Sequence, residues 1–154
     1  YDNFILEQQD MPNFREQNRF HAPYCRLSKF ITGYKAPSLK NAVIIGKKED
    51  DEPLSKVGNI TFGDLQFEVF EGNGGHVRGE TVFVCHEQKL LFSGDILVNI
   101  KGFSDEQREF NILAPYLMTS VNVDSKKAKI SRELIMEKYK GYKLYPAHGG
   151  PMEN

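Results

Sequence analysis

The alternation of apolar and polar residues is clearest in the middle of the chain, where it predicts paired β-strands. In LQFEVF, residues 65–70, every second side chain is apolar, which is the period of a half-buried strand. A second run, NITF at residues 59–62, precedes it, and Gly63-Asp64 between the two runs can form a turn. The two runs therefore predict a β-hairpin.

Other apolar runs have a β-type composition without strict alternation. Thr81–Cys85 and Leu90–Phe92 are two of them, and Glu87–Lys89 between them predicts a second hairpin turn. Asn41–Gly46 (NAVIIG) predicts a short buried strand, and Lys143–Tyr145 predicts a short last strand. With the first hairpin, these runs supply the strands of the predicted sheet.

Toward the C-terminus the period changes from that of strands to that of helices. Ser104, with Gln107 three positions later, fits a capping box and predicts the start of a helix. Asp124-Ser125 is a second candidate N-cap, followed by an amphipathic segment at residues 126–140 that Gly141 is suited to end. The apolar side chains on one face of that segment are Ala128, Ile135 and Tyr139.

The N-terminal third of the chain is less regular. Residues 2–10 predict a short helix that Pro12 would end, and residues 13–40 predict loops with helical turns. Lys47–Pro53 (KKEDDEP) is a run of charges that predicts a solvated loop. The order of hairpins, helices and last strand predicts a layered α/β arrangement in which helices pack on a sheet.

Composition narrows the class of protein. The chain has 154 residues, enough for one domain with a core, and its 20 Lys and Arg nearly balance its 21 Asp and Glu. Nucleic-acid binding would need a basic excess, and a membrane span would need an apolar run of roughly 20 residues, so neither is expected. Cys25 and Cys85 lie far apart without a CxxC, which favours a reducing, cytoplasmic compartment.

Three residues at the ends of predicted strands could carry chemistry. His76 lies among glycines in EGNGGHVRGE, Asp95 follows LLFSG, and His148 follows a strand in YPAHGG. Loops at strand ends commonly hold catalytic residues, and two imidazoles with a carboxylate suit Zn(II) or Fe(II). Taken singly, each residue is more often an ordinary turn residue, and only their shared position favours a metal site.

Other reactive side chains have simpler explanations. His86 falls in the predicted turn CHEQ and is expected to be exposed, whereas Cys85 ends a predicted strand and is expected in the core. Arg78, next to the His76 loop, is either a solvated arginine or a contact for an anionic substrate.

The ordered set of motifs FEVFEGNGGHVRGETVFV, KLLFSGD and LYPAHGG resembles the C-terminal half of the metallo-β-lactamase fold superfamily. In that family a strand leads into a Gly-His loop, a Gly-Asp follows two strands later, and a Pro-x-His-Gly element comes after a further helical segment. The resemblance covers about residues 55–150 and leaves residues 1–54 hard to assign. It implies an αββα-sandwich, here as one partial domain with a mixed sheet and helices on one face.

The resemblance implies the roles of the three candidate residues. His76 would bind one metal ion, Asp95 would bridge two, and His148 would bind the second. A carboxylate can bridge two metal ions about 3.5–4 Å apart. The two ions would lower the pKa of a water molecule that they share and so give a hydroxide nucleophile. The family chemistry implies two zinc ions in an intact site, with iron as an alternative.

The chain departs from the family pattern in one respect. The family's leading motif, His-x-His-x-Asp-His, is absent, and His21 stands alone in RFHAPYC. We expect a longer protein whose N-terminal half carries that motif. Because catalytic zinc sites usually have three protein ligands per ion, we expect weak or no metal binding and no activity in this chain alone.

The resemblance implies a metal-dependent hydrolase acting on an ester, thioester, lactone or phosphoester bond of a small-molecule substrate. An iron-dependent oxidoreductase on the same fold and a non-catalytic domain are the alternatives, because fold alone does not decide function. A half-fold would expose part of its core face, so pairing with the missing N-terminal half or with another copy of the chain is expected.

Overall fold

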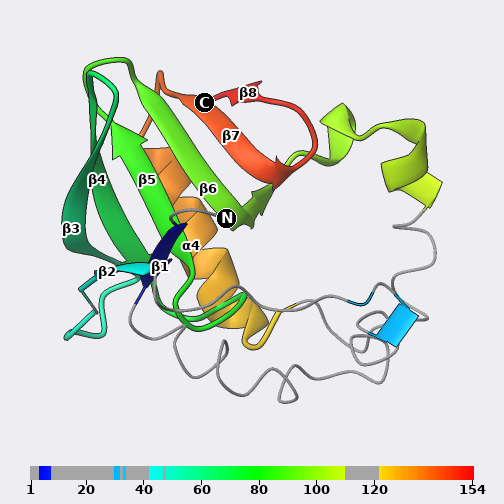
Figure 1. Cartoon of the computed structure of the whole chain (residues 1–154). Helices are drawn as coiled ribbons and strands as arrows, with labels where there is room; N and C mark the ends of the chain where they lie inside the picture. The colour runs from blue at the N-terminus through cyan, green and yellow to red at the C-terminus, as the bar shows by residue number, and fades with distance from the viewer. Residues whose placement is uncertain (1–3, 8–29, 32, 34–41, 47, 110–121) are drawn as a thin grey trace.

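The computed structural model describes residues 4–7, 30–31, 33, 42–46, 48–109 and 122–154 (Figure 1). Within these residues the strands form a six-stranded sheet and a separate two-stranded one. The six strands, in their order across the larger sheet, are β3 (Leu54–Phe62), β4 (Leu65–Gly72), β5 (Thr81–Cys85), β6 (Leu90–Val98), β7 (Lys143–His148) and β8 (Met152–Glu153).

The larger sheet is mixed. Neighbouring strands from β3 to β6 pair antiparallel, β6 and β7 pair parallel, and β8 returns antiparallel to β7. Consequently β4, β6 and β7 all run in the same direction. The carboxyl ends of these three strands therefore lie along one edge of the sheet.

Helix α4 (Ser125–Lys138) lies across one face of this sheet, and the main core fills the space between them (Figure 1). Ile135 and Tyr139 from the helical segment are almost fully buried against Val82, Leu91 and Leu144 from three strands. Burial of such a side chain contributes about 1.5–3 kcal/mol. The amphipathic pattern of residues 126–140 is thus explained by this contact, and the predicted layered α/β arrangement is confirmed.

The opposite face of the sheet carries aromatic side chains. Phe67 and Phe92 meet edge to face with ring centroids 6.0 Å apart, and Phe92 stacks on Tyr145 at 4.9 Å. Because side chains alternate between the faces of a strand, these rings point away from α4. The ring of Phe92 remains partly exposed.

The predicted helix boundaries agree with the capping contacts. Asp124 accepts hydrogen bonds from the backbone N–H groups of Lys126 and Lys127, and Gly141 adopts a φ of 77° after the helix ends. Ser104 and Gln107 form the reciprocal bonds of a capping box at the start of a helical turn over residues 105–109. No helix among the described residues is long and apolar enough to span a membrane.

The N-terminal prediction was wrong where the structure describes it. Within residues 2–10, expected to be a helix, β1 (Phe4–Glu7) is a strand that pairs parallel with β2 (Ala42–Ile45). Pairing with a segment almost forty positions away has overridden the local pattern, as it commonly does for short apolar runs. The loops expected at residues 13–40 lie mostly outside the described residues.

The other strand predictions were correct in kind. Thr81–Cys85 matches β5 in full, whereas the strand predicted at residues 41–46 is shorter, and its Val43 is 53% exposed rather than buried. The remaining strands are longer than predicted. Both hairpins form, but β3 and β6 each have nine residues, and β7 continues to His148. Asp95 consequently lies inside β6 rather than after it. The register of pairing between β6 and β7 shifts on both sides of Gly94. Strand β6 therefore continues past Gly94, although its hydrogen-bonded pairing with β7 is interrupted there.

Candidate metal centre

The three residues singled out from the sequence meet at the edge where β4, β6 and β7 end. His76 comes from the loop after β4, Asp95 from the irregular part of β6, and His148 is the last residue of β7. The Nε2 atom of His76 is 3.5 Å from Asp95 Oδ2, and the Nε2 atom of His148 is 3.2 Å from Asp95 Oδ1. One carboxylate thus faces two imidazoles, with one oxygen toward each.

The backbone on both sides of His76 is held in place by the start of α4. The N–H of Val123 donates to the carbonyl of His76, and the N–H of Asp124 donates to that of Gly75. Gly75 lies so close to the helix that a Cβ there would be 2.2 Å from the backbone nitrogen of Ala128. Only glycine permits this approach between the loop and α4.

The imidazole ring of His76 is oriented by Asn122. Its Nδ1 lies 3.2 Å from the side-chain oxygen of Asn122, which can only accept a hydrogen bond. In the tautomer that carries its proton on Nδ1, the ring donates to Asn122, and Nε2, which faces Asp95, is left to bind a cation. This arrangement, in which the second ring nitrogen donates to an oxygen, is typical of metal-ligating histidines.

Asp95 is half-buried and electrostatically tied to both histidines. Its interaction with His76 lowers the pKa of Asp95 below its usual value, burial opposes this, and the charge of His148 adds a smaller lowering. In turn, Asp95 raises the pKa of His76, against the effect of burial, with a further rise from Asn122. Among the described residues, the buried Oδ1 atom of Asp95 has no hydrogen-bond partner.

The separations are compatible with shared metal ligation as well as with imidazole–carboxylate hydrogen bonds. Two ligands bound at 2.0–2.2 Å to one tetrahedral zinc ion lie roughly 3.3–3.5 Å apart. The two Nε2-to-oxygen distances, 3.5 and 3.2 Å, are close to this value. A third pair provides a contrast, because His86 Nε2 and Glu68 Oε2 lie at an ordinary hydrogen-bond distance of 2.8 Å.

The described residues supply only part of the ligands that a metal centre requires. Each cation position would receive one imidazole nitrogen and one oxygen of Asp95, whereas catalytic zinc sites usually have three protein ligands. Within the part of the chain that the structure describes, no group of three or more His, Cys, Asp or Glu is arranged to hold one ion. The three residues fit half of a two-metal site.

Solved structures with the same arrangement of elements exist. The BLEG-1 B3 metallo-beta-lactamase matches with a TM-score of 0.51 and 19% identity over 96% of this chain and 58% of that one. A metallo-beta-lactamase family protein from Thermus thermophilus matches with a TM-score of 0.58 and 17% identity over 97% of this chain and 48% of that one. No protein-family model matches the sequence, and no curated protein matches it.

The chain has a metallo-β-lactamase fold. It spans about half the length of the solved structures that it matches, so the fold is partial, as the motifs predicted. Proteins with the metallo-β-lactamase fold generally bind metal ions. At identities below 20%, these matches establish the arrangement of elements, while the ligand roles of His76, Asp95 and His148 stay predictions.

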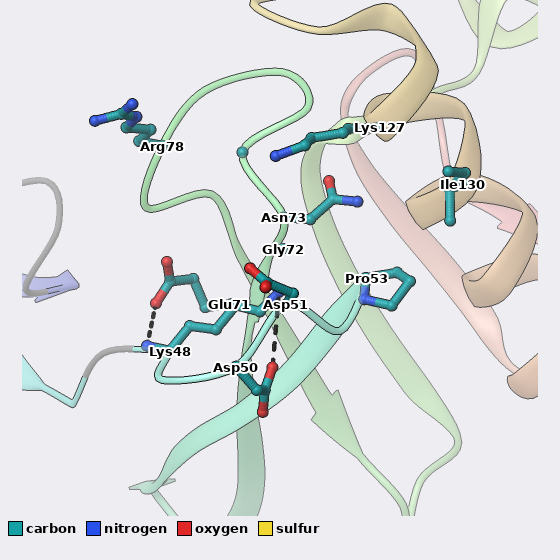
Figure 2. Close-up of a pocket in the computed structure, with 11 residues that line it drawn as sticks. Lys48, Asp50, Asp51, Pro53, Glu71, Gly72, Asn73, Arg78, Lys127 and Ile130 are labelled. Carbon is teal, nitrogen blue, oxygen red and sulfur yellow. Dashed lines mark hydrogen bonds and ion pairs between the residues drawn. The ribbon is translucent and has the colours of Figure 1, made fainter.

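A hollow of about 460 Å³ lies beside the end of β4 and the loop that follows it, where Gly72, Asn73 and Arg78 line it (Figure 2). Its lining includes acidic residues, among them Asp50 and Asp51, and basic ones, among them Arg78 and Lys127. Figure 2 shows Arg78 pointing outward, away from Lys127, so these two cations do not converge on one anion. None of the three candidate ligands lines it, so it is separate from the proposed centre of this metallo-β-lactamase fold.

The remaining sequence-based interpretations are confirmed where the structure describes them. Cys85 is fully buried, and His86 is exposed in its turn although it bonds to Glu68 and Tyr142. Arg78 is exposed, as expected of a solvated arginine, and a contact with an anionic substrate stays a prediction. His21 and Cys25 lie outside the described residues.

Sequence reasoning missed three residues that hold the candidate ligands in place: Glu80, Asn99 and Asn122. Glu80 accepts hydrogen bonds from the His76 loop, and Asn99 bonds to the loop after His148. Nothing in the local sequence of Asn99 or Asn122 marks these contacts. The closeness of Glu80 to a Gly-His-x-x-Gly loop was the one available signal, because a carboxylate beside consecutive backbone N–H groups can satisfy several of them.

Proposed function

We propose that the intact protein is a metal-dependent hydrolase in which this chain supplies half of a two-metal centre. The observation that carries the proposal is the Asp95 carboxylate, which faces the Nε2 atoms of His76 and His148 at 3.5 and 3.2 Å. The metallo-β-lactamase fold supports it, since the matched fold is that of metal-binding proteins that are often hydrolases.

Each residue has a distinct task in this proposal. In the tautomer that donates from Nδ1 to Asn122, His76 presents Nε2 to a cation. Asp95 provides one oxygen to each cation position, and its lowered pKa keeps it ionised at neutral pH. When bound, the ions would polarise a carbonyl or phosphoryl oxygen of the substrate and lower the pKa of a water molecule.

The substrate class follows from this chemistry. Esters, thioesters, lactones and phosphoesters all carry an oxygen that a cation can polarise and a leaving group that water can replace. The chain covers about half of its structural neighbours, so we propose that the remaining ligands come from an N-terminal half or from another copy of the chain. On this basis metal binding by the chain alone is weak.

Metal identity separates hydrolysis from redox chemistry. Two imidazoles and a carboxylate also suit Fe(II), so an iron-dependent oxidoreductase is the second candidate. Elemental analysis of the intact protein purified without added metal should find zinc for a hydrolase. Iron, together with oxygen consumption in place of bond hydrolysis, would favour the oxidoreductase.

Replacing Asp95 by alanine in the intact protein tests the proposal. Loss of the bridging carboxylate should remove most of the bound metal. Removing a residue that only hydrogen-bonds to a metal ligand reduces activity by about 10–100-fold, and we expect Asp95→Ala to reduce hydrolysis by more than that. His86→Ala is the matched control, because His86 also pairs with a carboxylate, that of Glu68, but lies in the turn between β5 and β6 and not at the candidate site. Full activity and full metal content in Asp95→Ala would contradict the proposal.

A further inference from the structure

Glu80 is a buried carboxylate that the proposed chemistry does not use directly. It precedes β5 and is only 7% exposed. Burial of an isolated charge is strongly unfavourable unless hydrogen bonds compensate it. Its side chain must therefore have partners, and these partners lie in the loop that carries His76.

The carboxylate of Glu80 accepts hydrogen bonds from three consecutive backbone N–H groups of that loop. Oε1 accepts from Gly75 at 3.1 Å, and Oε2 accepts from His76 at 3.0 Å and Val77 at 3.4 Å. Successive N–H groups that point into one concavity form a natural cradle for an anion. Here the anion is a side chain of the same loop.

The end of β4 leaves room for this carboxylate. A Cβ on Gly72 would lie 2.5 Å from Oε1 of Glu80, so glycine is required there for the side chain to occupy its place. The N–H of Gly72 also donates to the carbonyl of Glu80 at 2.9 Å. These contacts fix Glu80 at the base of the loop.

The peptide units around His76 are therefore held from two sides. Glu80 binds the N–H groups of Gly75 and His76, while Val123 and Asp124 bind their carbonyl groups. With both groups of each residue engaged, the backbone of His76 has little freedom to move relative to Asp95. A ligand held in this way reaches its metal position without an ordering step at the moment of binding.

We propose that Glu80 is a positioning residue for the metal centre: its buried carboxylate holds the backbone of residues 75–77 and thereby sets the position of the His76 imidazole. The inference rests on the proposed metal-binding role of His76, but it makes a separate claim about the loop without metal. It also explains the residue type, since an ionised carboxylate only accepts hydrogen bonds and has enough lone pairs for three N–H groups.

Glu80→Gln is the sharpest variant. Glutamine has the same reach, but its NH₂ group can only donate, so at least one of the three N–H groups would face another donor. In a zinc titration of the intact protein, followed by the imidazole ¹⁵N and ¹H NMR shifts, we expect Glu80→Gln to need about 10-fold more zinc to shift His76 than the unmodified protein does. The His148 response should change much less, because its loop does not contact Glu80.

Glu71→Gln is the matched control. Glu71 is a similarly buried glutamate at the end of β4, and its Oε2 accepts a hydrogen bond from the backbone N–H of Lys48, in a different loop. We expect this control to leave the His76 response unchanged. Equal zinc dependence of His76 in Glu80→Gln and the unmodified protein would overturn the proposal, as would an equal loss in Glu71→Gln.

Backbone amide exchange without metal separates this inference from the proposed function. The N–H groups of Gly75, His76 and Val77 should exchange slowly in the unmodified chain and faster in Glu80→Gln. If His76 did not respond to zinc in the intact protein, the metal role would fail, whereas the amide exchange data would still test the role of Glu80. Unprotected amides at these positions in the folded, unmodified chain would overturn the positioning role, even if the variant did not fold.

Discussion

The two loops that carry the candidate histidines lie at the same edge of the sheet but are held by different means. The His76 loop surrounds a buried carboxylate and contacts the start of α4 through two carbonyl groups. The His148 loop is held by Asn99, whose backbone N–H donates to the carbonyl of His148 and whose side chain donates to that of Gly150. The first loop uses a carboxylate, the second a neutral amide.

The two histidines also differ in exposure, and the one in the loop held by the carboxylate is the less exposed. The His76 side chain is 24% exposed and that of His148 is 59% exposed. Hydrogen bonds to a charged group contribute roughly twice as much as neutral ones. We infer that His76 is the pre-positioned ligand of the pair, whereas His148 remains accessible from solvent at the end of its strand.

The largest expected effect comes from separating the His76 loop from α4. In Gly75→Ala the added methyl would collide with the backbone of Ala128, which cannot move without shifting the helix. We expect the free energy of unfolding, measured by urea denaturation, to fall by about 3 kcal/mol.

Gly63→Ala in the first hairpin is the control for backbone strain alone. Gly63 has a φ of 60°, and a Cβ added there would have no atom within 4 Å, so only the left-handed conformation is penalised. That change should cost about 1–2 kcal/mol. If Gly75→Ala were the milder of the two, the close contact between loop and helix would not matter for stability.

An intermediate effect is expected from Asn99→Ala, which weakens the other loop. The variant loses the side-chain bond to the Gly150 carbonyl and the one from the Gly102 N–H. Two neutral hydrogen bonds correspond to a destabilisation of about 1–3 kcal/mol in urea denaturation. Amide exchange should accelerate around residues 148–150 and stay unchanged at residues 75–77; the reverse pattern would show that the two loops are not independent.

The smallest effect concerns the imidazole–carboxylate pair away from both loops. Lys56 and, less strongly, His86 lower the pKa of Glu68 below its usual 4.5, which means that the folded state binds the ionised form better. Its contribution to stability is thus present above about pH 4.5 and is lost as the pH falls through the lower folded value.

Acid titration of thermal stability in Glu68→Gln checks this expectation. The slope of stability against pH below 4.5 should be shallower in the variant than in the unmodified chain. The pair is partly exposed, so salt should weaken the difference. An unchanged slope would mean that Glu68 does not distinguish the folded from the unfolded state.

Local patterns were sufficient for much of the fold. The hairpin around Gly63-Asp64, the cap at Asp124 and the stop at Gly141 were predicted because each depends on residues a few positions apart. The strand at residues 4–7 was not, because its partner β2 lies nearly forty positions away and its short apolar run is compatible with either element.

The order of the His76, Asp95 and His148 motifs was enough to predict the partial fold and to single out the candidate site. That the three residues meet became apparent in the fold, where β4, β6 and β7 run in the same direction. The tertiary structure alone revealed Glu80, Asn99 and Asn122 as the residues that hold them. A hydrogen bond from a side chain to the backbone of another segment requires no fixed spacing between the two residues in the sequence. Strands, caps and turns do require such spacing, so they can be predicted from it.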